Sequence, residues 1–514
     1  MAFHSPAFLL AFLPLLLVAF HVAARRLPAL AAPLLLLASL AFYAWADPAS
    51  LPLLLASMLA NYAISGKVLV DAGRRRFWVG LGVLVNLLPL ILYKYVVPAS
   101  SHSSGAFLIA GMPLGLSFYS FQQITCLFDI QRPGALRLNP LRHALFVGLF
   151  AQLPAGPISR YRDLAPQIAA LGRTPVAPQV LLAGLSLFLL GLGKKVIFAD
   201  HIGHFVDLFH QALARGERPV LLESWLACWG FMLQLYFDFS GYSDMAVGIA
   251  LCFGLWLPVN FNSPLKAASP SEFVDRWHMS LVAWVREYLY QPLFRWVRRW
   301  PLGDPPRRRL WAWAIATLCS MGLLGAWHGA SLALLLGGLA SGVLMVLSQL
   351  PGLLPASARL APSGWRRRAW RLTARFLLLL TLSVLGLFSR ADSLDSLARV
   401  LGSLLDLGSL SLSPAYAHLL PAGLGGWIAA DGFFPHLPAY RGLDVLLLGL
   451  GTLLVFATRN TVQRFGYVAP QEGICAGALG WRPSLRWGVA IGGVVLLTLL
   501  LGERAGQGFI YARL

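Results

Sequence analysis

The sequence predicts an all-α polytopic membrane protein in which residues 1–514 form a single integral membrane domain. Hydrophobic residues make up 58% of the 514 residues and charged residues only 12%, whereas soluble proteins carry about 25% charged residues. The mean hydropathy is +0.68. Apolar stretches of about 17 to 25 residues can each cross a bilayer, and we count roughly ten to twelve of them, some interrupted by Gly or Pro. Breaks are expected at residues 25–28, which end in Pro28, and at Asp47 and Pro48. Residues 78–97 form a further span, with Tyr93, Lys94 and Tyr95 as interfacial anchors near one end, and residues 258–271, which include Asn260, form a short polar loop.

The charge balance follows from membrane topology. Lys and Arg number 41 against 21 Asp and Glu, a formal charge of +20. The basic residues gather in short loops between apolar runs, so the positive-inside rule explains them and no nucleic-acid partner is predicted. The clusters, all expected on the cytoplasmic side, are Lys67 with residues 74–76, residues 295–309 and residues 366–375. Residues 392–442, which are poor in basic side chains, are expected on the external side.

Neither cysteine nor histidine spacing predicts a metal site. The five cysteines contain no CxxC pair and most lie in apolar runs, which argues against a disulfide framework or zinc. Residues 200–210 carry His201, His204 and His210 with two aspartates at helical spacing, a pattern that metal ligands also use. The polar face of an interfacial amphipathic helix explains that run as well. Residues 8–22 are expected to be a retained first span because no basic segment precedes them.

Several segments are too polar or too broken for a lipid-facing helix. Residues 111–125 and 146–160 combine Gly and Pro with Gln, Ser and Thr. Because exposed backbone groups in hydrocarbon cost several kcal/mol each, we expect both segments inside the protein, the second as a re-entrant loop. An ordinary kinked helix is the alternative. Residues 271–293 mix polar and aromatic side chains, which predicts an interfacial or partly inserted helix.

A polar seam interrupts the apolar run of residues 226–257. Asp238 and Tyr242 share one helical face, and Ser240 and Asp244 form the next pair. Carboxylates in such a segment must face protein or water, so the seam is predicted to be buried.

His328 lies between two apolar runs, residues 310–325 and 332–350. An ionisable ring at membrane depth is a candidate functional site, although a histidine that only hydrogen-bonds a neighbouring helix fits the same pattern. Together with His278 it could remove a proton from a hydroxyl that attacks an activated acyl carbon. There is no Gly-x-Ser-x-Gly elbow and no P-loop. A proton-coupled transporter also uses intramembrane His and Asp, and composition does not separate the two classes.

Motifs spread over most of the chain resemble the membrane-bound O-acyltransferases, and more closely the subgroup that acetylates bacterial exopolysaccharides. The central motifs are residues 237–245 (FDFSGYSDM), 276–281 (RWHMSL) with Trp284, Arg286 and 288–293 (YLYQPL), and 325–329 (GAWHG). The flanking ones are residues 42–45, 61–62, 113–122 and 509–511.

The resemblance implies a bundle around a central tunnel, with His328 as the catalytic histidine and His278 as the second motif histidine. Substrate-binding roles are assigned to Asp238, Tyr242, Asp244 and Trp327. The resemblance also implies a cytoplasmic acetyl donor, acetyl-CoA, with no bound cofactor, in the bacterial inner membrane. Periplasmic partner proteins would complete acetylation of a polymer such as alginate. Met279 after His278 and the chain ending at residues 511–514 depart from the subgroup pattern and leave the polymer open.

Overall fold

The computed structural model describes residues 2–100, 112–132, 137–350, 364–391, 393–409, 442–469 and 477–502. Within these ranges the regular elements are helices, and the one β-bridge joins Val468 to Ala478. Eight of the described helices are long and apolar enough to span a membrane, and Gly442–Ala457 and Leu485–Leu501 are shorter apolar helices. The prediction of an all-α, multi-pass protein of the lipid bilayer is confirmed.

The first four long helices form the N-terminal part. They are α1 (Leu13–Arg26, preceded by the π-helical turn Phe8–Phe12), α2 (Ala31–Ala46), α3 (Leu51–Val70) and α4 (Arg75–Ile91), which continues through a π-helical turn into α5 (Val97–Ser100). At the predicted breaks, α1 ends before Pro28 and α2 ends before Pro48. Phe3 and Phe8 are buried and pack with Phe42 and Phe150. The first segment is therefore part of the core.

The two broken polar segments lie inside the protein, as predicted. Almost every residue of α6 (Leu116–Asp129) is buried, and residues 149–160 form an irregular buried stretch between α7 (Pro140–Gly148) and α8 (Tyr161–Ala170). Gly115 has φ +70°, and a Cβ there would lie 2.2 Å from the Leu153 carbonyl oxygen. Glycine is therefore needed where the two segments touch.

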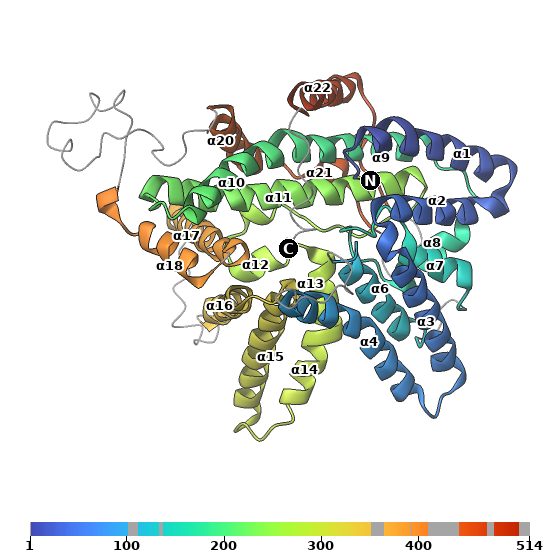
Figure 1. Cartoon of the computed structure of the whole chain (residues 1–514), viewed down its shortest axis with the longest axis horizontal. Coiled ribbons are helices and arrows are strands. Elements are labelled where there is room, and N and C mark those ends of the chain that lie inside the picture. The colour runs from blue at the N-terminus through green and yellow to red at the C-terminus, as the bar shows by residue number, and fades with distance from the viewer. Residues whose placement is uncertain are drawn as a thin grey trace.

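Two long helical stretches cross the middle of the molecule side by side (Figure 1). One is α9 (Pro178–Gly193), a π-helical turn (Lys194–Ala199) and α10 (Asp200–Ala214); the other is α11 (Leu221–Cys252). A Cβ on Gly191 would lie 2.5 Å from the Gly241 carbonyl oxygen, so the backbones approach closely. The prediction that residues 200–210 form an interfacial helix was wrong. They continue α9, and most of their side chains are buried because α11 and α20 cover them.

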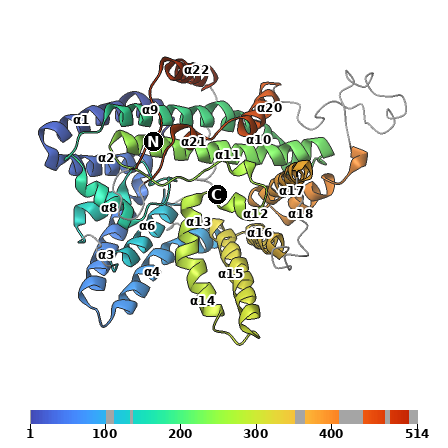
Figure 2. The ribbon, with the colours of Figure 1, turned by 180° about the vertical axis from the view of Figure 1, so that it is seen from behind.

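The site region follows α11 as a series of short helices and then a hairpin. The short helices are α12 (Pro270–Val274), α13 (Met279–Val285) and α14 (Gln291–Val297); the hairpin consists of α15 (Pro305–His328) and α16 (Leu332–Gln349). The predicted interfacial helix at residues 271–293 is therefore broken into half-buried pieces. Figure 1 shows α14 and α15 extending downward from the layer of α9 to α11, and Figure 2 shows the same arrangement from behind.

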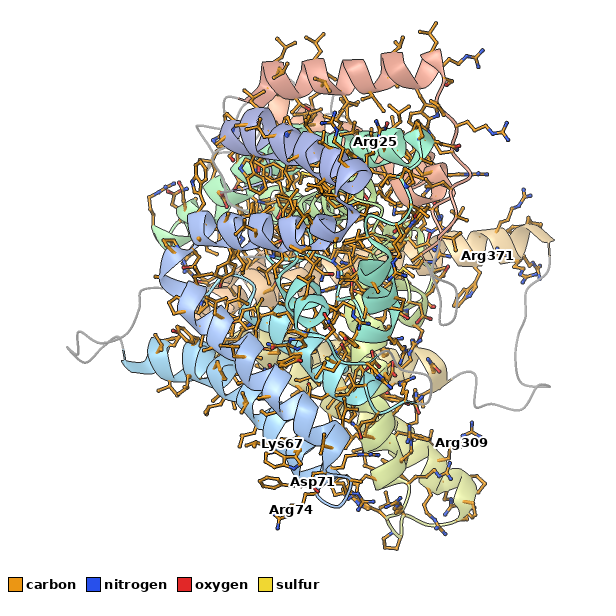
Figure 3. The ribbon with its side chains drawn as sticks, turned by 90° about the vertical axis from the view of Figure 1, so that its right-hand side faces the viewer. Arg25, Lys67, Asp71, Arg74, Arg309 and Arg371 are labelled. Carbon is orange, nitrogen blue, oxygen red and sulfur yellow. The ribbon has the colours of Figure 1, made fainter. Side chains whose placement is uncertain are left out.

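The C-terminal helices surround this frame. They are α17 (Gly364–Arg390), α18 (Leu394–Ser403), α20 (Gly442–Ala457), α21 (Thr461–Phe465) and α22 (Leu485–Leu501). Most of the region predicted to be external, Cys475 and the chain ending lie outside the described residues. Figure 3 shows Lys67, Arg74 and Arg309 at the same lower end of the molecule, with Arg371 apart from them. The side of the membrane that each cluster faces stays a prediction.

The polar seam of α11 is buried and ion-paired with the π-helical turn before α10. Lys195 Nζ lies 2.6 Å from Asp238 and 2.8 Å from Asp200, and all three side chains are at most 2% exposed. Lys194 Nζ lies 2.6 Å from Asp244. Because an unpaired charge in this surrounding would be very costly, these pairs fix the register of α11 against its neighbour.

Replacing Asp238 with Ala leaves Lys195 with one carboxylate in a buried site. We expect the variant to lose about 3–5 kcal/mol of folding stability, as is usual when one member of a buried pair is removed. Asp207→Ala is the matched control, because Asp207 pairs with Arg390 where both side chains are more than 25% exposed and should lose about 1 kcal/mol or less. Thermal unfolding in detergent measures both. Equal shifts would contradict a buried, structural seam.

Candidate active site

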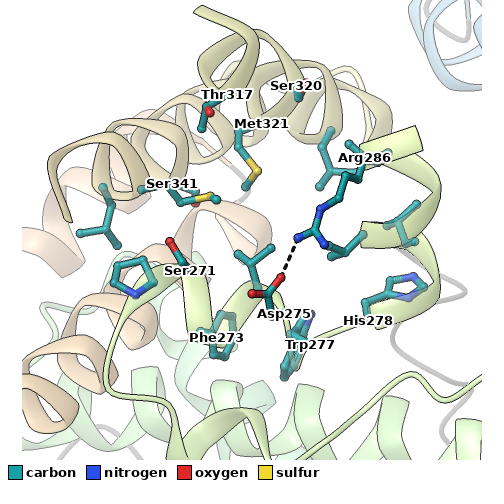
Figure 4. A pocket seen from close by; sticks show the side chains of 18 of the residues that line it. Ser271, Phe273, Asp275, Trp277, His278, Arg286, Thr317, Ser320, Met321 and Ser341 are labelled. Atoms are coloured by element: carbon teal, nitrogen blue, oxygen red, sulfur yellow. Dashed lines mark hydrogen bonds and ion pairs between the residues drawn. The ribbon is translucent and has the colours of Figure 1, made fainter. Parts of the chain in front are cut away.

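His278 and His328 line one cavity of about 520 Å³. The cavity lies between α12, α13, α15, α16 and α17, and its lining is mainly apolar. Figure 4 shows His278 and Trp277 on one wall, Thr317, Ser320 and Met321 of α15 on another, and the ion pair of Arg286 with Asp275 between them. The Arg286–Asp275 distance is 2.6 Å, and both side chains are more than half exposed.

His328 is the last residue of α15, where the chain turns at Gly329 into α16. The neighbouring Trp327 donates from Nε1 to Ser117 Oγ of α6 at 3.2 Å, and its ring lies 5.4 Å from that of Phe121. The Trp327 and His328 rings are 4.6 Å apart. Trp327 thus fixes the helix end on α6, while His328 faces the cavity.

His278 precedes α13 in a conformation that L-residues seldom adopt, with φ +44° and ψ +49°. Its Nδ1 lies 3.4 Å from Asn260 Oδ1. Asn260 Oδ1 also accepts hydrogen bonds from the backbone N–H of Ser280 at 3.3 Å and from the Ser280 hydroxyl at 2.6 Å. Because Asn260 presents an acceptor here, His278 Nδ1 must carry the proton in this contact, which leaves Nε2 as the basic nitrogen.

Burial keeps the His278 ring neutral. The side chain is 3% exposed, and burial, with a smaller contribution from His328, lowers the pKa of His278 to about 3. A neutral imidazole that is protonated on Nδ1 carries its basic lone pair on Nε2 and can accept a proton there during a reaction.

A second cavity of about 520 Å³ lies on the other side of α13. Its lining is more polar and includes Ser159, Arg160, Asn262 and Ser280. Ser280 faces this cavity, His278 faces the first, and Asn260 bonds to both. The loop around Asn260 therefore forms the partition between two hollow regions.

The structure separates the sequence-predicted residues into two groups. His278 and His328 line the same cavity, and Trp327 lies directly beside His328. Asp238, Tyr242 and Asp244 line neither cavity: the carboxylates pair with lysines, and Tyr242 is 3% exposed and stacks on Phe3 with ring centroids 5.2 Å apart. The substrate-binding roles of these residues stay predictions, and for these three the geometry favours a packing role. In the described part of the chain, no cluster of three or more potential metal ligands occurs.

Two residues at the site were missed by sequence reasoning. Asn260 was noted only as part of a polar loop, and no local pattern marks it as the partner of a histidine 18 residues later. Lys94, with Tyr93 and Tyr95, was interpreted as an interfacial anchor. That interpretation was wrong for Lys94, which is 9% exposed and bonds to the backbone of residues 327 and 328.

The fold and this cavity define a multi-pass membrane protein whose paired histidines are suited to acyl transfer. The family model of the membrane-bound O-acyltransferases matches residues 136–389. A peptidoglycan O-acetyltransferase of Helicobacter pylori is 32% identical over 448 residues, which cover 80% of this chain and 81% of the relative. A probable alginate O-acetylase of Pseudomonas fluorescens is 33% identical over 420 residues, covering 80% and 77%. A teichoic acid D-alanyltransferase of Bacillus subtilis is 28% identical over 270 residues, covering 51% and 66%.

The chain belongs to the membrane-bound O-acyltransferase family, and it is an acyltransferase.

Asn260→Asp places a carboxylate against His278 Nδ1. The carboxylate stabilises the imidazolium, so the pKa of His278 rises and its protonated fraction grows as pH falls. We expect the acid limb of the acyl-transfer pH–rate profile to move to higher pH. Asn262→Asp is the control, since it adds the same charge where the side chain bonds to Gln463 instead. An acid limb that stays in place in Asn260→Asp would rule out this contact.

Proposed function

We propose that this protein is an O-acetyltransferase that moves acetyl groups from cytoplasmic acetyl-CoA across the bacterial inner membrane, for O-acetylation of an extracytoplasmic polysaccharide such as alginate. The observation that carries the proposal is the apolar cavity to which two separate elements bring His278 and His328. The relatives named for acetylating alginate and peptidoglycan support acetyl as the group and a surface polymer as its destination.

The shape of the cavity suits an acyl donor carried on a long arm. On α15 its lining extends from Trp313 to His328, a rise of about 22 Å at 1.5 Å per residue. The basic cluster Arg307 to Arg309 ends about one turn before Trp313. A coenzyme A molecule with its phosphates near these arginines would have its thin pantetheine arm in the apolar cavity and its thioester near His328.

The transfer needs only one base. His328 takes the proton of the acceptor hydroxyl while the hydroxyl oxygen attacks the acetyl carbonyl carbon. The carbon–sulfur bond then breaks, and the departing thiolate takes the proton back from the imidazolium. The products are an acetyl ester and the free coenzyme A thiol, and the histidine returns to its starting state. His278, which lines the same cavity, is the second group that can bind or relay this proton.

Beyond the membrane, periplasmic partner proteins would complete the transfer to the polymer. A protein that only transports substrate or protons, and an enzyme that acylates lipid or protein, are the competing functions. Labelled acetyl-CoA given to the purified protein separates them: a transporter yields neither hydrolysis nor acetylated acceptor. Competition by acyl-CoAs of different length tests for a long-chain donor.

His328→Ala should reduce acetyl transfer about 10²–10⁴-fold, the usual contribution of a general base. The measurement is acetate on the secreted polysaccharide together with acetyl-CoA turnover by the purified variant, at equal protein levels in the membrane. His204→Ala is the control, because His204 bonds to Asp444 far from the cavity. Normal acetylation by His328→Ala would remove this residue from the mechanism.

Ser320→Trp should block the cavity between its basic end and His328. Ser320 is 3% exposed and lines the cavity, whereas the adjacent Cys319 is exposed and does not line it. We expect Ser320→Trp to raise the KM for acetyl-CoA strongly or abolish turnover, and Cys319→Trp to leave both unchanged. Ser320→Leu provides a smaller obstruction if the indole prevents folding. Normal donor kinetics in folded Ser320→Trp would exclude this route.

A further inference from the structure

The helix α4 reaches the catalytic region although none of its residues lines the cavity. It contains Pro89 in its last turn and continues as the π-helical turn Leu92–Val96. One extra residue in a helical turn rotates the following side chains by about 100°. The turn carries Lys94, whose ammonium group reaches the end of α15.

Three successive carbonyls at the end of α15 are satisfied by this turn. Lys94 Nζ donates to the carbonyl oxygen of Trp327 and, at 3.4 Å, to that of His328. The Tyr95 hydroxyl donates to the Ala326 carbonyl. The last carbonyls of a helix have no intrahelical partner, and a cation there also interacts favourably with the helix dipole. Lys94 additionally lies 4.8 Å from the centroid of the Trp327 ring.

We propose that Lys94 is a positioning residue that fixes the orientation of His328 for acyl transfer. The end of α15 is held from two sides, by Lys94 on the carbonyls of residues 327 and 328 and by Ser117 on the Trp327 indole. With the backbone fixed at both residues, the Cα–Cβ bond of His328 keeps one direction, and the ring that it carries lines the cavity. The inference rests on the proposed role of His328 as the base.

Substituting Lys94 should have different effects if Lys94 only stabilises the end of α15 and if it also positions His328. Loss of a cap lowers the melting temperature and leaves the turnover of the folded fraction unchanged. Loss of positioning lowers kcat in protein that is still folded, because a displacement of about 1 Å at a reacting group can reduce the rate about 100-fold.

The test compares Lys94→Met, Lys94→Ala and Tyr95→Phe with Lys67→Met, a control at an exposed lysine of α3. We expect Lys94→Met to lower kcat about 100-fold with the KM for acetyl-CoA unchanged. Tyr95→Phe should have a smaller effect and Lys67→Met none. Ethylammonium should restore turnover to Lys94→Ala, which leaves space for it, and not to Lys94→Met. Wild-type kcat in folded Lys94→Met, or a reduced kcat with no rescue of Lys94→Ala, would overturn the proposal.

A readout without turnover keeps this proposal separate from the proposed function. Diethyl pyrocarbonate modifies imidazole nitrogen. For each Lys94 or Lys67 variant, the modification rate of His328 is the rate measured with His328 present minus the rate of the same variant carrying His328→Ala. Lys94→Met should change this rate and Lys67→Met should not. If the wild-type protein turns over no acetyl-CoA, the proposed function fails, and an unchanged His328 rate in Lys94→Met would independently overturn the positioning role.

Discussion

The buried contact of Lys195 with Asp238 and Asp200 is the interaction on which the rest of the site depends. It joins α11 to the π-helical turn before α10, deep in a surrounding that cannot solvate a free charge. Once α11 is fixed in this way, its other residues hold the loop of His278. Phe239 packs edge-on against the His278 ring with centroids 4.6 Å apart, and Ser243 Oγ accepts the amide N–H of Asn260 at 3.2 Å. By fixing the position of α11, the ion pairs of the seam also fix the position of the His278 loop that packs on α11.

The two histidines reach the cavity by different local means. His278 is held in a left-handed backbone conformation, which is strained for a residue other than glycine. The strain is maintained by contacts of the ring with Asn260 and Phe239 and by the hydrogen bond from the Met279 N–H to the Asn260 carbonyl. His328 requires no such strain, since it is the last helical residue before a glycine turn. The His278 ring is thus fixed by the loop that carries it, and the His328 ring by contacts that other elements make with the end of α15. Substitutions that weaken packing around α11 should therefore displace the His278 ring, and substitutions that weaken the contacts of α15 should displace the His328 ring.

The sequence predicted the features that depend on local pattern or on motif identity. Helix ends at Pro28 and Pro48, burial of residues 116–125 and the hairpin at His328 follow from hydropathy, proline and glycine, which act within a few residues. The role of the seam was not predictable in this way. Asp238 and Asp244 are intramembrane carboxylates whether they face a substrate or a lysine, and only the packing of α9 against α11 shows that Lys194 and Lys195 lie opposite them. Lys94 was misinterpreted for a related reason: an aromatic-flanked lysine near a helix end has the composition of an interfacial anchor, and the Trp327 carbonyl that binds it is 233 residues away.

The environment of the hairpin turn determines where acyl transfer can occur. A helix of 24 residues such as α15 is about 36 Å long, so two full crossings perpendicular to the membrane would place His328 at the opposite surface. The turn is instead enclosed by other parts of the chain: the π-helical turn after α4 contacts its carbonyls, and α6 binds the Trp327 indole. Gly325 and Gly338 let α15 and α16 approach so closely that a Cβ on either would lie 3.0 Å from the other's Cα. Because the long helices run in different directions in Figure 1, some must be strongly tilted in a common bilayer. His328 is thus half-buried and enclosed by other parts of the chain whatever its depth in the lipid. In the proposed mechanism, acyl donor and acceptor therefore reach it through cavities within the fold.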